Sequence, residues 1–284
     1  MDARLQLRIQ RYGWDLAAWD YEPLWRSQLA EAQAAVLDTA ALAPGERVLD
    51  VASGTGLITF ESAMAVGNSG SVFGIDLSAN MVQAARRRTA GQRPGNVCFA
   101  RMDAQALDFD DASFDVVLCS LGLMYVPDPD QALREMHRVL RPGGRMIAAV
   151  WGERARCGWS ALFSIVDAEV ASEVCPLFFH LGQCDTLANR CGAANFVVVE
   201  RRRLVTTLDY ADADEACNAA FVGGPVALAW SRLDVDARNR VRARYIEAIT
   251  KWRCDRGYRV PAEFVIVAAQ SGATSTVDSR GKLR

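Results

Sequence analysis

The amino-acid sequence predicts an α/β fold built around a mostly parallel sheet of about seven strands. Between residues 46 and 151, apolar strand-like segments alternate with helical segments roughly every 25 residues, which is typical of βαβ units. The apolar segments are continuous rather than alternating, and such strands are buried on both faces. Helices are therefore expected on both sides of the sheet.

The individual elements follow from local patterns. Leu57–Val66 is apolar and helical and is followed by Gly67, a residue that ends helices. Ser78 can cap the helix that runs to Arg87, and 142–144 (Pro-Gly-Gly) should turn the chain before the strand at 145–151. Strands are expected at 48–52, 71–76, 96–101, 114–120, 145–151, 196–208 and 263–269, and further helices at 129–140, 160–171, 184–191 and over most of 211–253.

The composition excludes several functional classes. Hydrophobic residues make up 51% and charged residues 23% of the chain, and the net charge is −2, so no basic footprint of a nucleic-acid binder is present. No segment approaches the ~18 uninterrupted apolar residues of a membrane span. Residues 1–10 lack the apolar region of a secretory signal, so a cytoplasmic location is expected. The eight cysteines form no C-x-x-C pair, and no metal site is expected.

A glycine-rich loop follows the first strand, with the sequence VLDVASGTG at 48–56. Glycines let a ligand approach the backbone, and free amides at the start of the next helix face it. A nicotinamide dinucleotide site would need a third glycine, but Thr59 stands at that position. Asp76 ends the second strand, twenty residues after Gly56, where a carboxylate can accept from both hydroxyls of a ribose.

Five successive motifs carry a resemblance to a known family: VLDVASGTG, GIDLS, RMDAQ, FDVVLCSLGLMY and LRPGGR. In this order they resemble the motifs of class I S-adenosylmethionine-dependent methyltransferases and are similar to the group that includes the ubiquinone/menaquinone-biosynthesis C-methyltransferases. The resemblance covers 46–151 and implies a Rossmann-like, doubly wound fold that binds S-adenosylmethionine and releases S-adenosylhomocysteine. The departure from the usual pattern is Ala52, at a loop position that is often glycine.

The resemblance also implies residue roles. The loop would surround the methionine part of the cofactor, Asp76 would hold the ribose, and Asp103 would accept from the adenine amino group. Ser120 would lie near the reacting methyl group. The expected cofactor-binding residues are Asp50, Ala52, Ser53, Gly54, Thr55, Gly56, Asp76, Leu77, Met81, Met102, Asp103, Ala104 and Ser120.

The acceptor is less defined. Nucleic-acid amino methyltransferases of similar fold carry an acidic or amide residue and Pro-Pro-aromatic after the fourth strand, but here the chain reads SLGLMY at 120–125. A small apolar, phenolic, amine or thiol acceptor is therefore expected, with His180, Tyr21 and Tyr12 as candidate catalytic residues. Two alternatives stay open: an arsenite-type enzyme that uses the thiols of Cys157, Cys175, Cys184 and Cys191, and a non-catalytic protein that only binds the cofactor.

The domain organisation is expected to have four parts. Residues 1–44 would form a helical lid and 45–151 the cofactor-binding core. Residues 152–270 would complete the sheet and cover the acceptor with helical insertions, and 271–284 would be a disordered tail. The sequence does not predict an oligomeric state.

Overall fold

The computed structural model describes residues 3–91, 95–170 and 178–272. Its sheet has the order β3-β2-β1-β4-β5-β8-β6, and the short β7 pairs with β8 outside this path. The first five strands are parallel, whereas β8 is antiparallel to both β5 and β6. The strands are β1 (Arg47–Val51), β2 (Ser71–Asp76), β3 (Val97–Arg101), β4 (Phe114–Ser120), β5 (Leu140–Trp151), β6 (Phe196–Tyr210), β7 (Arg253–Cys254) and β8 (Gly257–Ser271).

The predicted Rossmann-like α/β fold is confirmed, and two predicted boundaries are wrong. The segment at 142–144 does not precede β5 but lies within it, as a bulge: Leu140 pairs with Phe114 and Arg145 with Val116. Extra residues on one strand of a ladder are accommodated in this way. Ser271, which was expected to begin a disordered tail, instead lies in β8 and pairs with Phe196, and its hydroxyl donates to the Arg141 carbonyl. Residues 273–284 lie outside the described residues.

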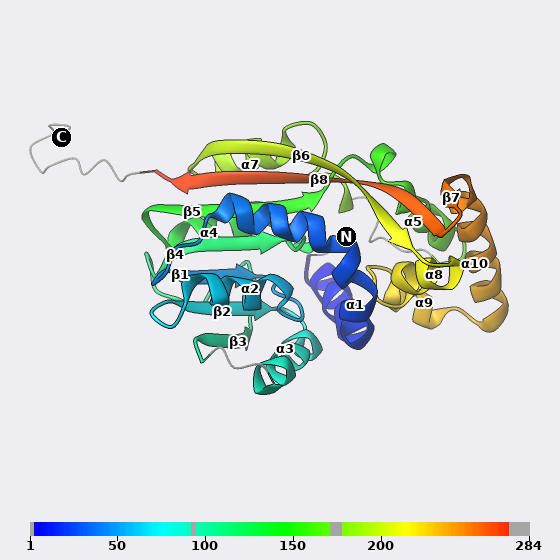
Figure 1. The fold of residues 1–284 in the computed structure, drawn as a ribbon, viewed down its shortest axis with the longest axis horizontal. Coiled ribbons are helices and arrows are strands. Elements are labelled where there is room, and N and C mark those ends of the chain that lie inside the picture. Colours follow the sequence, from blue (N-terminus) through cyan, green and yellow to red (C-terminus); the bar gives the residue numbers. More distant parts are fainter. Residues whose placement is uncertain (1–2, 92–94, 171–177, 273–284) are drawn as a thin grey trace, which may run out of the picture.

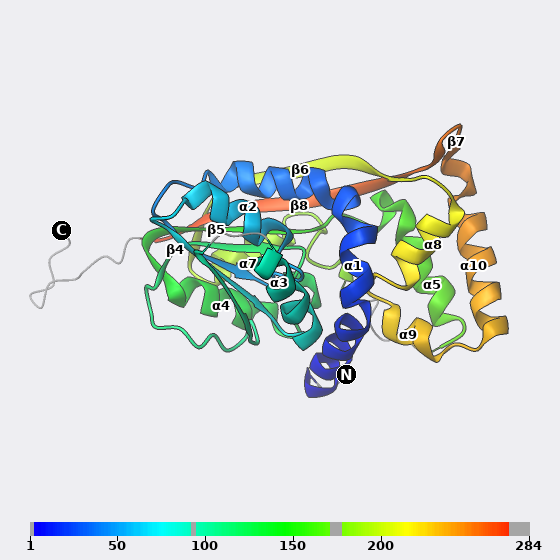
Figure 2. The same ribbon diagram turned by 60° about the horizontal axis from the view of Figure 1, so that its bottom comes forward.

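Helices cover both faces of the sheet. Figures 1 and 2 show α2 and the C-terminal half of α1 on one face, and α4 and α7 on the other. The central strands are fully buried between them, as their continuous apolar sequences predict. The α-helices are α1 (Ala3–Ala40), α2 (Leu57–Val66), α3 (Ala79–Gly91), α4 (Pro129–Val139), α5 (Ala161–Asp167), α7 (Thr186–Ala193), α8 (Ala213–Phe221), α9 (Ala227–Arg232) and α10 (Val235–Ile249). The 3₁₀ helices are η1 (Leu123–Tyr125), η2 (Arg154–Arg156), η3 (Gly158–Ser160) and η4 (Thr250–Trp252).

The strands β6 and β8 are much longer than the strands β1 to β4 of the same sheet. Each has 15 residues, and β8 pairs with β5 only from Phe264 onward, whereas its first half pairs with β6 and, at its start, with the short β7. This two-stranded ribbon runs past the end of β5 to a group of helices formed by α5, α8, α9 and α10, here called the helical cap (Figure 1). The ribbon therefore joins the parallel sheet to the helical cap.

Helix α1 connects the same two parts of the molecule. Figure 2 shows it bent, with its C-terminal half along the sheet and its N-terminal half beside α3 and α9. Pro23 lies inside the helix, where proline removes a backbone hydrogen bond and produces a kink. Trp25 donates to the Ala219 carbonyl in α8, and Asp15 accepts from the Ser78 hydroxyl at the start of α3. Within the described residues, no helix has the length and apolar character that crossing a membrane requires.

Candidate functional site

The loop between β1 and α2 has an unusual backbone. Ala52, Gly54 and Gly56 all have positive φ angles, of 58°, 55° and 82°. Only glycine fits at position 56, because a Cβ there would lie 2.8 Å from the Phe99 ring. Alanine at position 52 adopts a conformation that costs about 1 kcal/mol relative to glycine, and such strain is concentrated at functional sites. The loop folds at the point where the strand order reverses, where open α/β sheets bind ligands.

Asp76 is held in place beside this loop. Its carboxylate oxygens accept from the backbone N–H of Gly54 at 2.9 Å and of Ser78 at 2.8 Å. Burial, with a further contribution from the charge of Asp15, raises the pKa of Asp76 to about 6 in spite of these hydrogen bonds. The loop and the carboxylate are therefore fixed together before any ligand binds.

Asp50 lies deeper, at the end of β1. Its side chain is almost completely buried and accepts from the Thr59 hydroxyl at 2.5 Å. Burial raises its pKa to about 7, and the nearby charge of Asp76 contributes to the increase. These two carboxylates lie on the neighbouring strands β1 and β2, and in their ionised forms they give the site a negative potential that favours a cationic ligand.

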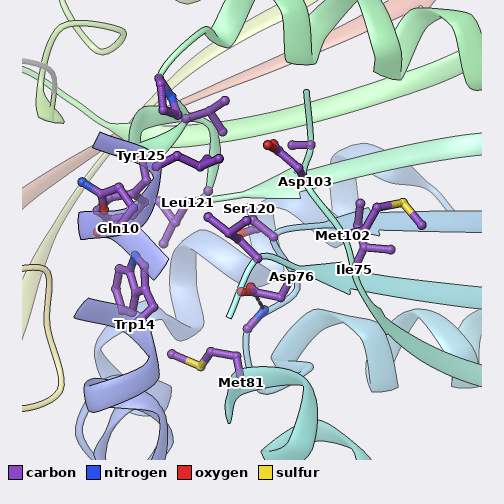
Figure 3. Close-up of a pocket in the computed structure, with 18 of the residues that line it drawn as sticks. Gln10, Trp14, Ile75, Asp76, Met81, Met102, Asp103, Ser120, Leu121 and Tyr125 are labelled. Carbon is purple, nitrogen blue, oxygen red and sulfur yellow. Dashed lines mark hydrogen bonds between the residues drawn. The ribbon is translucent and has the colours of Figure 1, made fainter. Parts of the chain in front are cut away.

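A cavity opens at the carboxyl ends of β1, β2, β3 and β4, here called the strand-end cavity (Figure 3). Asp76, Met81 and Met102 lie on one side of it, and Gln10 and Trp14 reach into it from α1 on the other (Figure 3). The predicted cofactor-binding residues that line it are Ala52, Gly54, Asp76, Leu77, Met81, Met102, Asp103, Ala104 and Ser120. The other predicted residues, which are Asp50, Ser53, Thr55 and Gly56, are buried in the loop and strand behind this lining.

Three hydroxyl groups near the cavity have buried oxygens without a hydrogen-bond partner among the described residues: those of Ser53, Thr55 and Ser120. An unpaired buried polar group costs about 1–3 kcal/mol. Of the three residues only Ser120 lines the cavity, where a polar ligand can offset this cost. At the far end, the Asp103 carboxylate accepts from the backbone N–H of Gln105 at 2.9 Å, which fixes its orientation. These residues fit an amino acid–ribose–adenine ligand in the order that the sequence resemblance implies.

Sequence reasoning missed most of the contribution of α1. Leu7, Gln10 and Trp14 line the cavity together with Tyr21, and these positions recur at spacings of three, four and seven residues. This spacing places all four on one helix face. The periodicity was therefore a usable signal for one functional face. Further lining residues that were not predicted to bind the cofactor are Ile75, Leu121, Gly122, Tyr125, Val126 and Pro127.

Of the three candidate catalytic residues, only Tyr21 lies at the cavity. Burial, followed by the charges of Asp76 and Asp50, raises the pKa of Tyr21 well above its ordinary value. Its hydroxyl therefore stays protonated at neutral pH and is suited to donate a hydrogen bond rather than to act as an ionised base.

The geometry does not support the other two candidates. Tyr12 is 52% exposed, with the Arg11 guanidinium 4.6 Å from its ring, because two residues along a helix turn the side chain to the opposite face from Trp14. His180 is exposed and its Nε2 lies 3.2 Å from a guanidinium nitrogen of Arg190. The neighbouring Phe178 and Phe179 are buried in the core. His180 follows them at the surface and does not line the cavity.

The described cysteines of the predicted thiol group differ in their exposure. Cys157 and Cys191 are buried, and burial raises the pKa of each thiol to about 12, whereas Cys184 is exposed. Cys175 lies outside the described residues. Among the described residues, no group of three or more His, Cys, Asp or Glu side chains is arranged to hold a metal ion.

The comparisons with known proteins match the central part of the chain. The family described as Methyltransferase domain matches residues 48–144. Ubiquinone/menaquinone biosynthesis C-methyltransferase UbiE of Hahella chejuensis is 46% identical over 112 residues, which are 39% of this chain and 45% of that protein. Demethylmenaquinone methyltransferase of Staphylococcus epidermidis is 38% identical over 133 residues, 47% of this chain and 52% of that protein. The chain thus spans about half the length of these relatives.

Solved structures resemble the whole chain more broadly, but only in fold. The BH2331 protein of Bacillus halodurans has a TM-score of 0.61 at 20% identity and covers 85% of this chain and 99% of its own. The [4+2]-cyclase SpnF has a TM-score of 0.57 at 20% identity, and the match covers 86% of this chain and 80% of the cyclase chain. The family match and the relatives agree that residues 48–144 are similar to a methyltransferase domain, and the fold around them is similar to that of these solved structures.

Proposed function

We propose that the protein transfers a methyl group from S-adenosylmethionine to a small apolar acceptor, with a phenolic or quinol compound as the leading class. The observation that carries the proposal is the strand-end cavity, in which Asp76 and Asp103 are oriented by backbone N–H groups at opposite ends. When bound, S-adenosylmethionine supplies an activated methyl group on a sulfonium. The relatives named for ubiquinone and menaquinone biosynthesis support a quinol acceptor.

The residues of the chain have three tasks in this function. Asp76 holds the ribose and Asp50 provides negative charge near the methionine end. Trp14, Tyr21 and Tyr125 enclose the reacting centre, because they pack edge to face at centroid distances of 5.7 and 5.0 Å. Exclusion of water and alignment of acceptor and methyl group supply much of the acceleration in such a displacement.

The first experiment is methyl transfer from radiolabelled S-adenosylmethionine to a panel of quinols, phenols, amines, thiols and arsenite. Transfer to a quinol or phenol is expected, and Tyr21→Phe should lower kcat several-fold with little change in cofactor affinity, because only the hydroxyl is lost. Transfer to arsenite would instead support the thiol-dependent alternative. No transfer to any acceptor, with cofactor binding intact, would favour a non-catalytic binding protein and contradict the proposal.

A further inference from the structure

A second cavity adjoins the strand-end cavity and is lined almost entirely by aromatic and apolar side chains. The two cavities share Trp14, Tyr21, Leu121 and Tyr125 in their linings. Leu121 has a φ of 62°, so a strained backbone position lies at the boundary between them. We call the second cavity the aromatic chamber, and its lining residues are Trp14, Tyr21, Trp25, Leu29, Leu121, Met124, Tyr125, Trp151, Trp159 and Pro225.

Three tryptophans, Trp25, Trp151 and Trp159, line the chamber but not the strand-end cavity. The ring centroids of Trp151 and Trp159 are 4.6 Å apart, and Trp25 lies 6.1 Å from each of them. Flat faces of this kind favour a flat aromatic ligand. None of the described residues that line the chamber carries a charge, so the energetic cost of desolvating an ionised ligand would have no compensation there.

Trp159, one of the lining residues, carries a fully buried polar atom without a partner among the described residues. The Nε1 of Trp159 is buried and donates to no acceptor within the described residues, although the side chain is only 1% exposed. Trp25, by contrast, donates its Nε1–H to the Ala219 carbonyl at 3.2 Å. Buried indole N–H groups normally find an acceptor, and a ligand oxygen in the chamber would supply it.

We propose that the aromatic chamber binds a flat, uncharged aromatic acceptor whose oxygen accepts a hydrogen bond from Trp159 Nε1. This inference rests on the proposed methyl transfer and narrows its acceptor class. Because the chamber and the strand-end cavity share Trp14, Tyr21 and Tyr125, an acceptor anchored by its oxygen at Trp159 extends toward the side where the methyl donor binds. Trp159 is thus a specificity-determining residue.

The test is equilibrium dialysis with the full chain saturated with S-adenosylhomocysteine, so that the strand-end cavity is filled. The probes are 2-naphthol, naphthalene and the anionic 2-naphthoate at pH 8. The wild type should bind 2-naphthol about tenfold more tightly than naphthalene, as one buried hydrogen bond implies, and should bind 2-naphthoate more weakly than 2-naphthol. Trp159→Phe should abolish the difference between 2-naphthol and naphthalene, and the exposed Trp19→Phe should preserve it.

The outcomes separate this inference from the proposed function. Equal affinities for 2-naphthol and naphthalene in the wild type would overturn the role of the indole N–H, whether or not Trp159→Phe folds. Preferred binding of 2-naphthoate would overturn the requirement for an uncharged ligand. Loss of S-adenosylhomocysteine binding in the wild type would contradict the proposed function itself, whereas retained binding with no preference for 2-naphthol would contradict only the inference.

Discussion

The strand-end cavity and the aromatic chamber share part of one wall but are built in different ways. On the sheet side, the strand-end cavity is made by loops that follow β1, β2, β3 and β4, and backbone N–H groups orient its carboxylates. The aromatic chamber is made by side chains from α1, η1, β5 and η3, which the ribbon and α1 bring together. Ligand recognition in the strand-end cavity depends on backbone geometry. In the aromatic chamber it depends on the packing of large side chains from distant segments.

This difference explains how much could be predicted from the sequence. The strand and helix on either side of the loop at 48–56, and the strand that ends at Asp76, could be predicted because they follow one another locally in the chain. The meeting of Trp25, Trp151 and Trp159 depends on long-range packing, which no local pattern encodes. The exposure of His180 was also beyond local patterns: its aromatic neighbours suggested a pocket, but the structure places its ring at the surface beside Arg190.

The largest expected effect is on the backbone of the loop. Gly56→Ala should lower the free energy of unfolding by about 3 kcal/mol, because the φ of 82° disfavours a side chain and the new Cβ would overlap Phe99 and Phe60. Gly192→Ala is the matched control: no atom lies within 4 Å of its Cβ position in α7, so it should be neutral or stabilise by about 0.5–1 kcal/mol. Urea denaturation measures both, and equal effects would contradict the assigned loop geometry.

The next effect is on cofactor binding. Asp76→Ala should weaken S-adenosylhomocysteine binding at least about tenfold, or ~1.4 kcal/mol, because the carboxylate loses its hydrogen bonds to the ribose. The exposed Asp110→Ala should bind normally. Calorimetry provides the measurement, and unchanged affinity in Asp76→Ala would remove the ribose assignment. Binding of 2-naphthol should change little, since Asp76 does not line the aromatic chamber.

The pH dependence should have opposite signs for cofactor binding and for stability. Asp76 must be ionised to accept from the ribose, and its pKa is about 6, so affinity should fall about tenfold from pH 7 to pH 5. In the ligand-free protein, the raised pKa of Asp76 means that, as the pH falls, the folded state binds the proton at a higher pH than the unfolded state does. Its contribution to stability is therefore present at low pH and is lost as pH rises through about 6.

Asp76→Asn removes this titration and serves as the control. The variant should show a flatter pH profile of affinity, with a remaining slope from Asp50, whose pKa is about 7. The difference in unfolding free energy between wild type and variant should favour the wild type more at pH 5 than at pH 8. A difference that does not change with pH would contradict the raised pKa of Asp76.

The smallest expected effect concerns the attachment of α1. Asp15 accepts from the Ser78 hydroxyl at 2.6 Å and from the Asn80 backbone N–H at 3.2 Å, which fixes α1 over the strand-end cavity. Asp15→Ala should increase the dissociation rate of S-adenosylhomocysteine about fivefold, equivalent to ~1 kcal/mol. Substitution of the exposed Asp20 on the same helix, Asp20→Ala, should leave this dissociation rate unchanged. Stopped-flow displacement measures both rates, and equal rates would show that this attachment does not retain the ligand.

The ribbon of β6 and β8 has a consequence for protein engineering. One continuous strand, Gly257–Ser271, completes the sheet at one end and supports the helical cap at the other. A chimera that exchanges acceptor preference between relatives therefore cannot use a single crossover near residue 151. It needs a second crossover inside β8 close to Phe264, where pairing with β5 begins, so that the transplanted cap brings its own half of the ribbon with it.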